Sequence, residues 1–504
     1  MGLKARLAYP IAKRIAINIR QQSLQAVAIQ DAIRAELVKQ AKDTAFGKAN
    51  QFASIRNYQD FKARVPIQDY EGLKPYIERI KSGEENVLWQ GKPIYFAKTS
   101  GTTSGVKYIP ITKASIPNHF NTARNALFNY MVETSNSAFM DGNMIFLSGS
   151  PTLEEVNGIL TGRLSGISNH LVPDWLKGNQ LPTWQTNCIE DWEEKLERIV
   201  TETLPADMRL ISGIPPWVQM YYERLLARTG KDYVKDIFPN FSIFVYGGVN
   251  FEPYRATLEA LVGKRLDSVE TYPASEGFIA FQDSQKEQGL LLNVASGIFF
   301  EFVPLEEINQ LHPTRLSLQD VQLGVNYVLI INSNAGLWGY NIGDTIAFVG
   351  LNPYRIIVTG RVKHFISAFG EHVIGKEVEE AMRKSCQQFP VKVVEFTVAP
   401  NVTPEEGGLP YHEWLIEFEE IPTNLAAFAE ALDQEMTEQN IYYRDLIVGN
   451  ILQPLKICVL SKDAFRSYMK SQGKLGGQNK VARLSNDRKI ADTLKKMKED
   501  SQPS

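Results

Sequence analysis

The chain has 504 residues, which is too long for one ordinary hydrophobic core and predicts two or three domains. Its hydrophobic fraction of 44% and charged fraction of 22% are typical of a globular protein and exclude a disordered one. The net charge of −3 gives no basic footprint for general nucleic-acid binding. Three widely separated cysteines, Cys188, Cys386 and Cys458, favour a reducing cytoplasm over a disulfide framework or a zinc site.

A basic, amphipathic segment opens the chain over residues 3–20, and Pro10 interrupts it. Its basic residues are Lys4, Arg6, Lys13, Arg14 and Arg20. Two structures fit this composition: a membrane-surface or transit helix, and a helix packed on the protein core, which we favour. No stretch approaches the ~20 consecutive apolar residues that span a bilayer. We therefore expect a soluble, cytoplasmic protein that has no membrane partner.

Predicted helices and strands alternate along the chain as far as residue 360. Leu24, Val27, Ile33 and Leu37 recur near helical spacing and predict a helix over residues 23–48. After a polar region punctuated by prolines, strands are predicted over 93–97, 144–149, 208–211, 241–246 and 325–331. Further helices are predicted over 116–131, 190–203, 215–229 and 252–263. This alternation indicates an α/β architecture with crossover connections.

The pattern changes after residue 360. Short strands are predicted over 391–398, 414–418 and 457–460, and helices over 376–388, 423–438 and 463–470. We therefore expect a small α+β domain after a larger α/β domain of mixed sheets and flanking helices. The boundary falls near residues 359–363, which gives an N-terminal domain over 1–361 and a C-terminal domain over 362–504.

A loop rich in Ser, Thr and Gly, residues 99–108, directly follows the predicted strand 93–97. Closely spaced backbone N–H groups, hydroxyl donors and one cation, here Lys107, are the set that holds a polyphosphate. The glycines let the backbone approach phosphate closely. The loop lacks the G-x-x-x-x-G-K-[ST] pattern of a Walker loop. Taken alone, the segment could also be a polar turn.

A second segment, residues 270–277, places an aromatic residue three positions before a Ser-Glu pair. Tyr272 can stack on a purine. Glu276 can present a carboxylate to Mg²⁺, which prefers oxygen ligands and bridges carboxylates to phosphates. The alternative is a strand end followed by a helix-capping pair, Ser275 and Glu276.

Three later segments each hold one polar candidate. In residues 339–346, Asp344 follows a glycine and can accept two hydroxyl hydrogen bonds, as a ribose requires; an ordinary Gly-Asp hairpin turn is the alternative. Arg361 lies at the expected domain boundary. Lys480 ends the glycine-rich segment 473–480 in a basic tail, where a solvated cation is the alternative. Each signal is weak alone, but chance does not readily produce all five segments in this order.

The ordered set resembles the adenylate-forming superfamily of acyl-CoA synthetases, peptide-synthetase adenylation domains and luciferase. Within it, the chain is most similar to the auxin-responsive acyl-acid amido synthetases, the Gretchen Hagen family, as a bacterial-type member. The narrower match rests on residues 41–48 and 76–80, on the loop in its form Ser-Gly-Thr-Thr-Ser-Gly, and on Tyr-x-x-Ser-Glu-Gly. The chain departs from plant members at Asn341, where they usually have Arg, and at Pro273, so plant hormone specificity does not transfer.

The resemblance implies a role for each matching residue. Tyr272 would lie on the adenine of ATP, while Asp344 and Arg361 would hold the ribose. Glu276 would coordinate Mg²⁺, and Lys480 would be the catalytic residue that bridges the carboxylate and the α-phosphate. The residues expected to hold the phosphates are Ser100, Gly101, Thr102, Thr103 and Ser104. The other residues expected in the ATP site are Tyr246, Gly247 and Ser275.

His119 and Arg124 lie on the predicted helix after the loop. Each could contact substrate, and each could equally well be a solvent-exposed helix position.

The resemblance also implies the reaction. A carboxylate would attack the α-phosphate of ATP to give acyl-AMP and pyrophosphate, mainly through positioning and charge neutralisation. The C-terminal domain would then rotate about a hinge near Lys363, and an amino acid would accept the acyl group. An acyl-CoA ligase and a nucleotide-binding regulator without catalysis are the alternatives. We expect ATP and Mg²⁺ as cofactors, a small carboxylic acid and an amino acid as partners, no nucleic acid, and a monomer.

Overall fold

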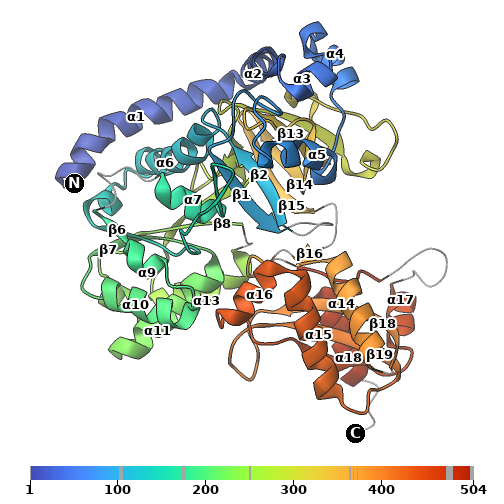
Figure 1. Cartoon of the computed structure of the whole chain (residues 1–504). Coiled ribbons are helices and arrows are strands. Elements are labelled where there is room, and N and C mark those ends of the chain that lie inside the picture. Colours follow the sequence, from blue (N-terminus) through green and yellow to red (C-terminus); the bar gives the residue numbers. More distant parts are fainter. Residues whose placement is uncertain are drawn as a thin grey trace. The chain divides into compact units, whose positions relative to one another are not determined.

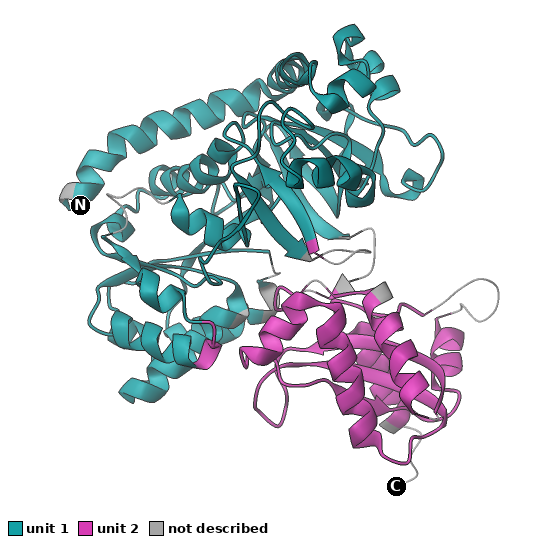
Figure 2. Ribbon diagram, viewed as in Figure 1, with its two compact units in different colours: residues 1–99, 107–189, 194–362 teal, residues 100–106, 190–193, 363–504 magenta. Residues whose placement is uncertain are grey.

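The computed structural model describes residues 2–100, 106–171, 178–248, 251–361, 365–366, 368–371, 373–389, 391–472 and 481–499. The chain forms two compact units, shown in Figures 1 and 2. Unit 1 comprises residues 1–99, 107–189 and 194–362, and unit 2 comprises residues 100–106, 190–193 and 363–504. The predicted fold class is confirmed: a large N-terminal α/β domain precedes a smaller C-terminal domain with both helices and strands.

Helices before residue 362 include all those that the sequence predicts there. They are α1 (Leu3–Leu24), α2 (Ala26–Ala41), α3 (Ala45–Ala49), α4 (Tyr58–Arg64), α5 (Tyr70–Lys81), α6 (Ile116–Glu133), α7 (Leu164–His170), α9 (Trp184–Asn187), α10 (Trp192–Thr203), α11 (Pro215–Thr229), α12 (Val234–Ile237) and α13 (Glu252–Val262). The predicted single helix over 23–48 is wrong in extent, because Thr44 divides it. The Thr44 hydroxyl donates to the Ala41 carbonyl at 2.7 Å and accepts from the Gly47 N–H at 3.0 Å, which caps α3. No described helix is both long and apolar enough to pass through a bilayer.

The main sheet of unit 1 has the strand order β12-β13-β14-β15-β11-β10-β9-β8-β7-β3-β6 among the described residues. Its strands are β3 (Asn143–Phe146), β6 (Gln180–Leu181), β7 (Met208–Ser212), β8 (Ile243–Gly247), β9 (Asp267–Ala274), β10 (Gly277–Phe281), β11 (Leu290–Leu292), β12 (Ile298–Pro304), β13 (Asn326–Ser333), β14 (Tyr340–Leu351) and β15 (Tyr354–Arg361). From β6 to β9 the neighbours are parallel, and from β9 to β12 they are antiparallel. The parallel strands therefore end at one common edge, where ligands bind in open α/β sheets.

A second sheet of unit 1 has the order β2-β1-β5-β4. Its strands are β1 (Tyr95–Ser100), β2 (Val106–Ile111), β4 (Glu154–Val156) and β5 (Ile159–Gly162). The largest core cluster of unit 1 contains residues of both sheets and of helices α2 to α5. Trp338 lies in this cluster, stacked on Phe46 at 6.1 Å between ring centroids, and its indole N–H donates to the Leu88 carbonyl at 3.0 Å.

Unit 2 contains a three-stranded sheet in the order β18-β19-β20. Its elements are β16 (Phe365–Ile366), β17 (Val373–Ile374), α14 (Gly375–Gln388), β18 (Lys392–Asn401), β19 (Tyr411–Glu420), α15 (Leu425–Gln439), α16 (Ile441–Val448), β20 (Lys456–Val459), α17 (Ala464–Ser471) and α18 (Lys489–Glu499). The predicted strands and helices are confirmed, and the elements that the sequence analysis missed are β16, β17, α16 and α18. Asn440 starts α16, because its side-chain oxygen accepts from the Tyr442 and Tyr443 N–H groups at 3.0 and 2.9 Å.

Candidate functional site

The turn between β9 and β10 carries two predicted site residues, Ser275 and Glu276. The two strands are antiparallel, and Gly277 pairs with Ala274 across the turn. Gly277 has a φ of +157°, and a Cβ there would lie 2.5 Å from Ile298 Cδ1, so a side chain at this position would collide with its neighbour. The alternative of a strand end followed by a helix cap is wrong, because a strand follows Glu276.

Asn118 on α6 holds the β10 side of this turn. Its Oδ1 accepts from the Phe278 backbone N–H at 2.6 Å, and its Nδ2 donates to the Ser296 hydroxyl at 2.8 Å and to the Phe278 carbonyl at 3.3 Å. The side chain is buried, so loss of these hydrogen bonds would leave polar groups without water. Asn118 therefore positions the turn that bears Glu276, a role that the sequence analysis missed.

Two tyrosine–carboxylate hydrogen bonds join the β9–β10 hairpin to β14. Tyr272 donates to the Asp344 carboxylate, and Tyr340 donates to Glu276 Oε1 at 3.4 Å. In the sheet, β10, β11 and β15 lie between β9 and β14, so these bonds require the sheet to curl. The curl brings Tyr272 and Asp344 together although they are 72 residues apart in the sequence.

Asp344 lies inside β14, so the hairpin-turn alternative is wrong. Asp344 is 6% exposed. The preceding Gly343 has a φ of +90°, and its N–H donates to Asn341 Oδ1 at 2.9 Å. Arg361 pairs with Asp344 in the β14–β15 register as the last residue of β15. The side chain of Arg361 lies outside the described part of the chain.

The surroundings of Glu276 keep the neighbouring phenol in its protonated, hydrogen-donating form. Burial raises the pKa of Tyr340 well above its ordinary value, and the nearby Glu276 carboxylate and Tyr70 raise it further. Burial also raises the pKa of Tyr70 to about 12. The Tyr70 hydroxyl accepts from the Tyr108 N–H at 3.0 Å, which ties β2 to this region. Lys107 on β2 has its Nζ 5.9 Å from the centre of the Tyr70 ring.

The Gly-rich segment connects two strands. β1 ends at Ser100 and β2 begins at Val106, and the Ile94 N–H donates to the Ile111 carbonyl at 2.9 Å just outside this pair. A strand follows the segment, so any phosphate binding here would rest on the loop itself without the N-terminus of a helix. The predicted phosphate-binding residues Gly101, Thr102, Thr103 and Ser104 lie outside the described residues, as does the side chain of Ser100. Lys480 lies outside them as well.

Tyr246 and Gly247 end strand β8 at the carboxyl edge of the parallel strands. The Tyr246 ring packs against Phe251, with 4.6 Å between centroids, and its hydroxyl donates to Glu270 Oε2 at 3.3 Å. The ring is therefore part of the packing beside this strand end. A Cβ on Gly247 would lie 2.4 Å from the Thr271 carbonyl oxygen, so glycine allows β8 to pack closely against β9.

His119 on α6 is buried, so the solvated alternative is wrong for this residue. Burial lowers the pKa of its imidazole to about 4, which leaves the ring neutral near pH 7. Arg124 donates to Asn125 Oδ1 at 3.0 Å and is partly exposed. Helical spacing places His119 near the side of α6 that carries the apolar Ile116 and Leu127, and this spacing favours burial. Spacing alone could not decide between a buried and a solvent-exposed His119.

Within the described ranges, no group of three or more His, Cys, Asp and Glu side chains could hold a metal ion. Glu276 offers a single carboxylate, a hard oxygen ligand of the kind that Mg²⁺ takes together with substrate phosphates. The donor set therefore fits a magnesium ion shared between the protein and a nucleotide, and it does not fit a metal held by the described side chains alone.

Three models of one family match the chain in sequence order. The GH3 family N-terminal domain matches residues 16–171, the GH3 family central domain matches residues 291–361, and the GH3 family C-terminal domain matches residues 376–489. Together these matches cover more than half of the chain. The chain belongs to the GH3 family.

Relatives with curated names include two plant enzymes. The jasmonoyl–L-amino acid synthetase JAR4 of Nicotiana attenuata is 22% identical over 422 residues, which cover 69% of this chain and 72% of the relative. The indole-3-acetic acid-amido synthetase GH3.3 of Arabidopsis thaliana is 22% identical over 538 residues, which cover 90% of this chain and 89% of the relative. A solved structure of the AtGH3.15 acyl acid amido synthetase in complex with 2,4-DB has a TM-score of 0.62 at 16% identity and covers 96% of both chains. This structural likeness establishes the GH3 fold.

Proposed function

We propose that this GH3 protein is an ATP-dependent acyl-acid amido synthetase. It converts a carboxylic acid to acyl-AMP with release of pyrophosphate, and it then transfers the acyl group to the amine of an amino acid. The observation that carries the proposal is the pair of hydrogen bonds, Tyr272 to Asp344 and Tyr340 to Glu276, that tie the β9–β10 hairpin to β14, in a chain that matches three GH3 domains in order. The curated relatives, named as amido synthetases of jasmonate and indole-3-acetic acid, support the reaction class.

The nucleotide would lie across the ends of β8 and β9 and the start of β14. Tyr272 offers an aromatic ring there, and its hydroxyl orients the Asp344 carboxylate. A buried carboxylate held in this way is suited to accept hydrogen bonds from ribose hydroxyls, because its oxygens cannot turn toward bulk water. Arg361, opposite Asp344 in the register, would complete the ribose contacts.

Charge neutralisation at the phosphates falls to groups near Glu276. In the first step a carboxylate oxygen bonds to the α-phosphorus while the bond to the bridging oxygen breaks and pyrophosphate leaves. Magnesium, held by Glu276 together with the phosphates, would offset negative charge there. Tyr340 holds the Glu276 carboxylate by its hydrogen bond, and by resemblance Lys480 would bridge the acid and the α-phosphate.

In the second step the amine nitrogen attacks the acyl carbon and loses a proton to solvent, while the bond from the acyl carbon to the phosphate oxygen breaks and AMP leaves. The protein's part is again to hold both reactants in line and exclude water. The same acyl-AMP could pass to a thiol, so the acceptor must be established by experiment.

The test is pyrophosphate release from ATP and Mg²⁺ with a panel of carboxylic acids, each run with an amino-acid mixture, with coenzyme A, and with neither. Mass spectrometry then identifies the products. Acid-dependent release that ends in an N-acyl amino acid supports the proposal. A thioester as the only product would make the protein an acyl-CoA ligase, and no release with any acid would leave a GH3 fold without the proposed activity.

Lys480 gives a sharper test of the chemistry. We expect Lys480→Ala to lower acyl-AMP formation severely while the protein stays folded. Lys470→Ala, on the exposed side of α17, is the matched control and should leave the rate unchanged. Equal rates in the two variants would remove Lys480 from the reaction.

A further inference from the structure

Helix α1 packs on α6 through one face of small residues (Figure 1). Ala5 and Ala12 are fully buried in a cluster with residues of α6, and Tyr9 and Ile15 pack against it. Asp141 holds the N-terminal end, where its carboxylate accepts from the Gly2 N–H at 2.7 Å and the Ala5 N–H at 3.4 Å. The expectation of a helix packed on the core is therefore confirmed for the inner face of α1.

The opposite face of α1 exposes large aliphatic side chains. Their exposed fractions are 68% for Leu7, 57% for Ile11, 49% for Ile17 and 62% for Leu24. Scattered exposed aliphatic residues are ordinary on a protein surface, but these four fall in two pairs on the outer side of one helix, Leu7 with Ile11 and Ile17 with Leu24. Packing on α6 leaves both pairs uncovered by any described part of unit 1.

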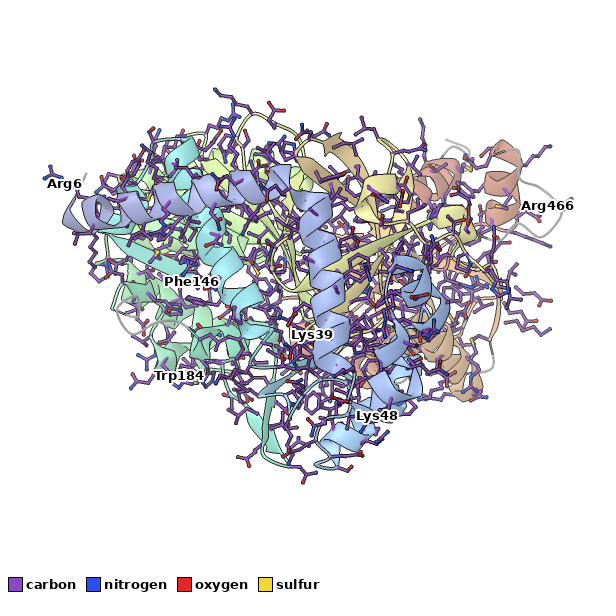
Figure 3. The ribbon with its side chains drawn as sticks, turned by 90° about the horizontal axis from the view of Figure 1, so that it is seen from above. Arg6, Lys39, Lys48, Phe146, Trp184 and Arg466 are labelled. Carbon is purple, nitrogen blue, oxygen red and sulfur yellow. The ribbon has the colours of Figure 1, made fainter. Side chains whose placement is uncertain are left out.

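The same outer face is strongly basic. Arg6, Lys13 and Arg20 recur every seven residues and thus form a row along the helix, and Arg14 lies between the aliphatic residues. All four are exposed, and none of them forms an ion pair with a described residue. Figure 3 shows Arg6 pointing away from α1 near the N-terminal end of the helix. The helix contains no Asp or Glu, although the whole chain has a net charge of −3.

We propose that the outer face of α1 binds the surface of an anionic membrane, with the helix lying in the plane of the lipid headgroups. Long basic side chains that flank aliphatic residues are the composition of interfacial helices, because their charged ends reach the headgroups while the aliphatic groups enter the acyl boundary. Charge complementarity selects the occupant: a helix with five basic and no acidic residues is attracted to acidic phospholipids. This revises the expectation of no membrane partner, and it does not depend on the proposed enzymatic function.

The probes are vesicles of phosphatidylcholine alone and of phosphatidylcholine mixed equally with phosphatidylserine, sedimented with the full-length protein. We expect binding to the phosphatidylserine vesicles that weakens as salt is added, and little binding to phosphatidylcholine. The triple variant Arg6→Gln, Lys13→Gln, Arg20→Gln should lose about a hundredfold in affinity, or about fivefold for each basic side chain. The control triple variant Lys231→Gln, Lys286→Gln, Lys462→Gln removes the same charge from exposed sites elsewhere and should bind like the wild type.

The double variant Ile11→Gln, Leu24→Gln separates a lipid surface from an acidic protein. We expect it to weaken vesicle binding but to leave binding to poly-glutamate unchanged. Thermal unfolding should be the same for all variants because the altered side chains are exposed. The proposal is overturned if the wild type does not bind phosphatidylserine vesicles, if both triple variants bind equally, or if poly-glutamate binds as tightly as the vesicles. A wild-type dimer that the α1 triple variant abolishes would assign the face to a second copy instead.

Discussion

Asn118→Ala tests whether α6 positions the turn that bears Glu276. The change removes three hydrogen bonds of a buried side chain and leaves the Phe278 N–H without its acceptor. An unsatisfied buried group of this kind costs about 1–3 kcal/mol, so we expect unit 1 to lose stability in that range. If the turn then shifts by about 1 Å, catalysis of adenylation falls by about a hundredfold.

Asn129→Ala is the matched control, because Asn129 is on the same helix and donates a single hydrogen bond, to the Asp283 carbonyl at 2.7 Å. We expect it to lower stability by about 1 kcal/mol and to leave the adenylation rate of the folded protein unchanged. The assays are urea unfolding and acid-dependent pyrophosphate release at saturating Mg²⁺. If Asn118→Ala keeps the wild-type rate per folded molecule, Asn118 does not position the site.

Four further predictions address single contacts. Tyr272→Phe removes the donor to Asp344 and should raise the KM for ATP at least tenfold, since a hydrogen bond to a charged group contributes about 1.5–3 kcal/mol. An unchanged KM in initial-rate assays would show that this hydrogen bond plays no part in nucleotide binding. Gly247→Ala places a Cβ 2.4 Å from the Thr271 carbonyl and should lower stability by about 1–3 kcal/mol in urea unfolding, whereas a wild-type midpoint would contradict the close packing of β8 on β9. Arg315→Met leaves the Glu301 carboxylate buried without its ion pair and should lower the free energy of unfolding by about 3–5 kcal/mol in chemical unfolding. Lys62→Met, at a half-buried neighbouring position, is the control and should not cause this loss. Burial raises the pKa of Glu377 from 4.5 to about 7, so protonation of this carboxyl stabilises the folded state below pH 4.5, and that stabilisation is lost as pH rises through 7. The free energy of unfolding of Glu377→Gln should therefore rise relative to the wild type by up to about 3 kcal/mol between pH 5 and pH 8. Profiles of unfolding free energy against pH that run parallel for the two proteins would refute the raised pKa.

Periodicity was sufficient for most of the fold. Helices α6, α11 and α13 and the buried strands β7, β8 and β13 follow from apolar spacing, because each buries one continuous apolar face or run. The predicted helix over 23–48 failed in its interior, where the Thr44 hydroxyl closes α2 and starts α3. Such caps depend on local hydrogen bonds that apolar spacing does not record.

The residues of the candidate site could be predicted from the sequence, but the contacts that hold them could not. Tyr272, Glu276 and Asp344 stand in motifs, whereas the hydrogen bonds of Tyr272 to Asp344 and of Tyr340 to Glu276 join strands that are not neighbours in the sheet, which no local pattern encodes. Asn118 and Tyr340 hold these residues through contacts across 160 and 64 positions of the sequence, and nothing in their own neighbourhoods signals that role. The same limit applied to α1, whose inner face was predicted while its exposed basic face needed the packing on α6 to become visible.

The most direct test of the central claim is acid-dependent exchange of labelled pyrophosphate into ATP, measured without any acceptor for the wild type and for Glu276→Gln across a magnesium titration. This exchange reports reversible acyl-AMP formation alone. The account predicts exchange that depends on the acid in the wild type, and in Glu276→Gln a much lower rate that rises only at higher magnesium. No exchange with any acid, or identical magnesium curves for the two proteins, would contradict it.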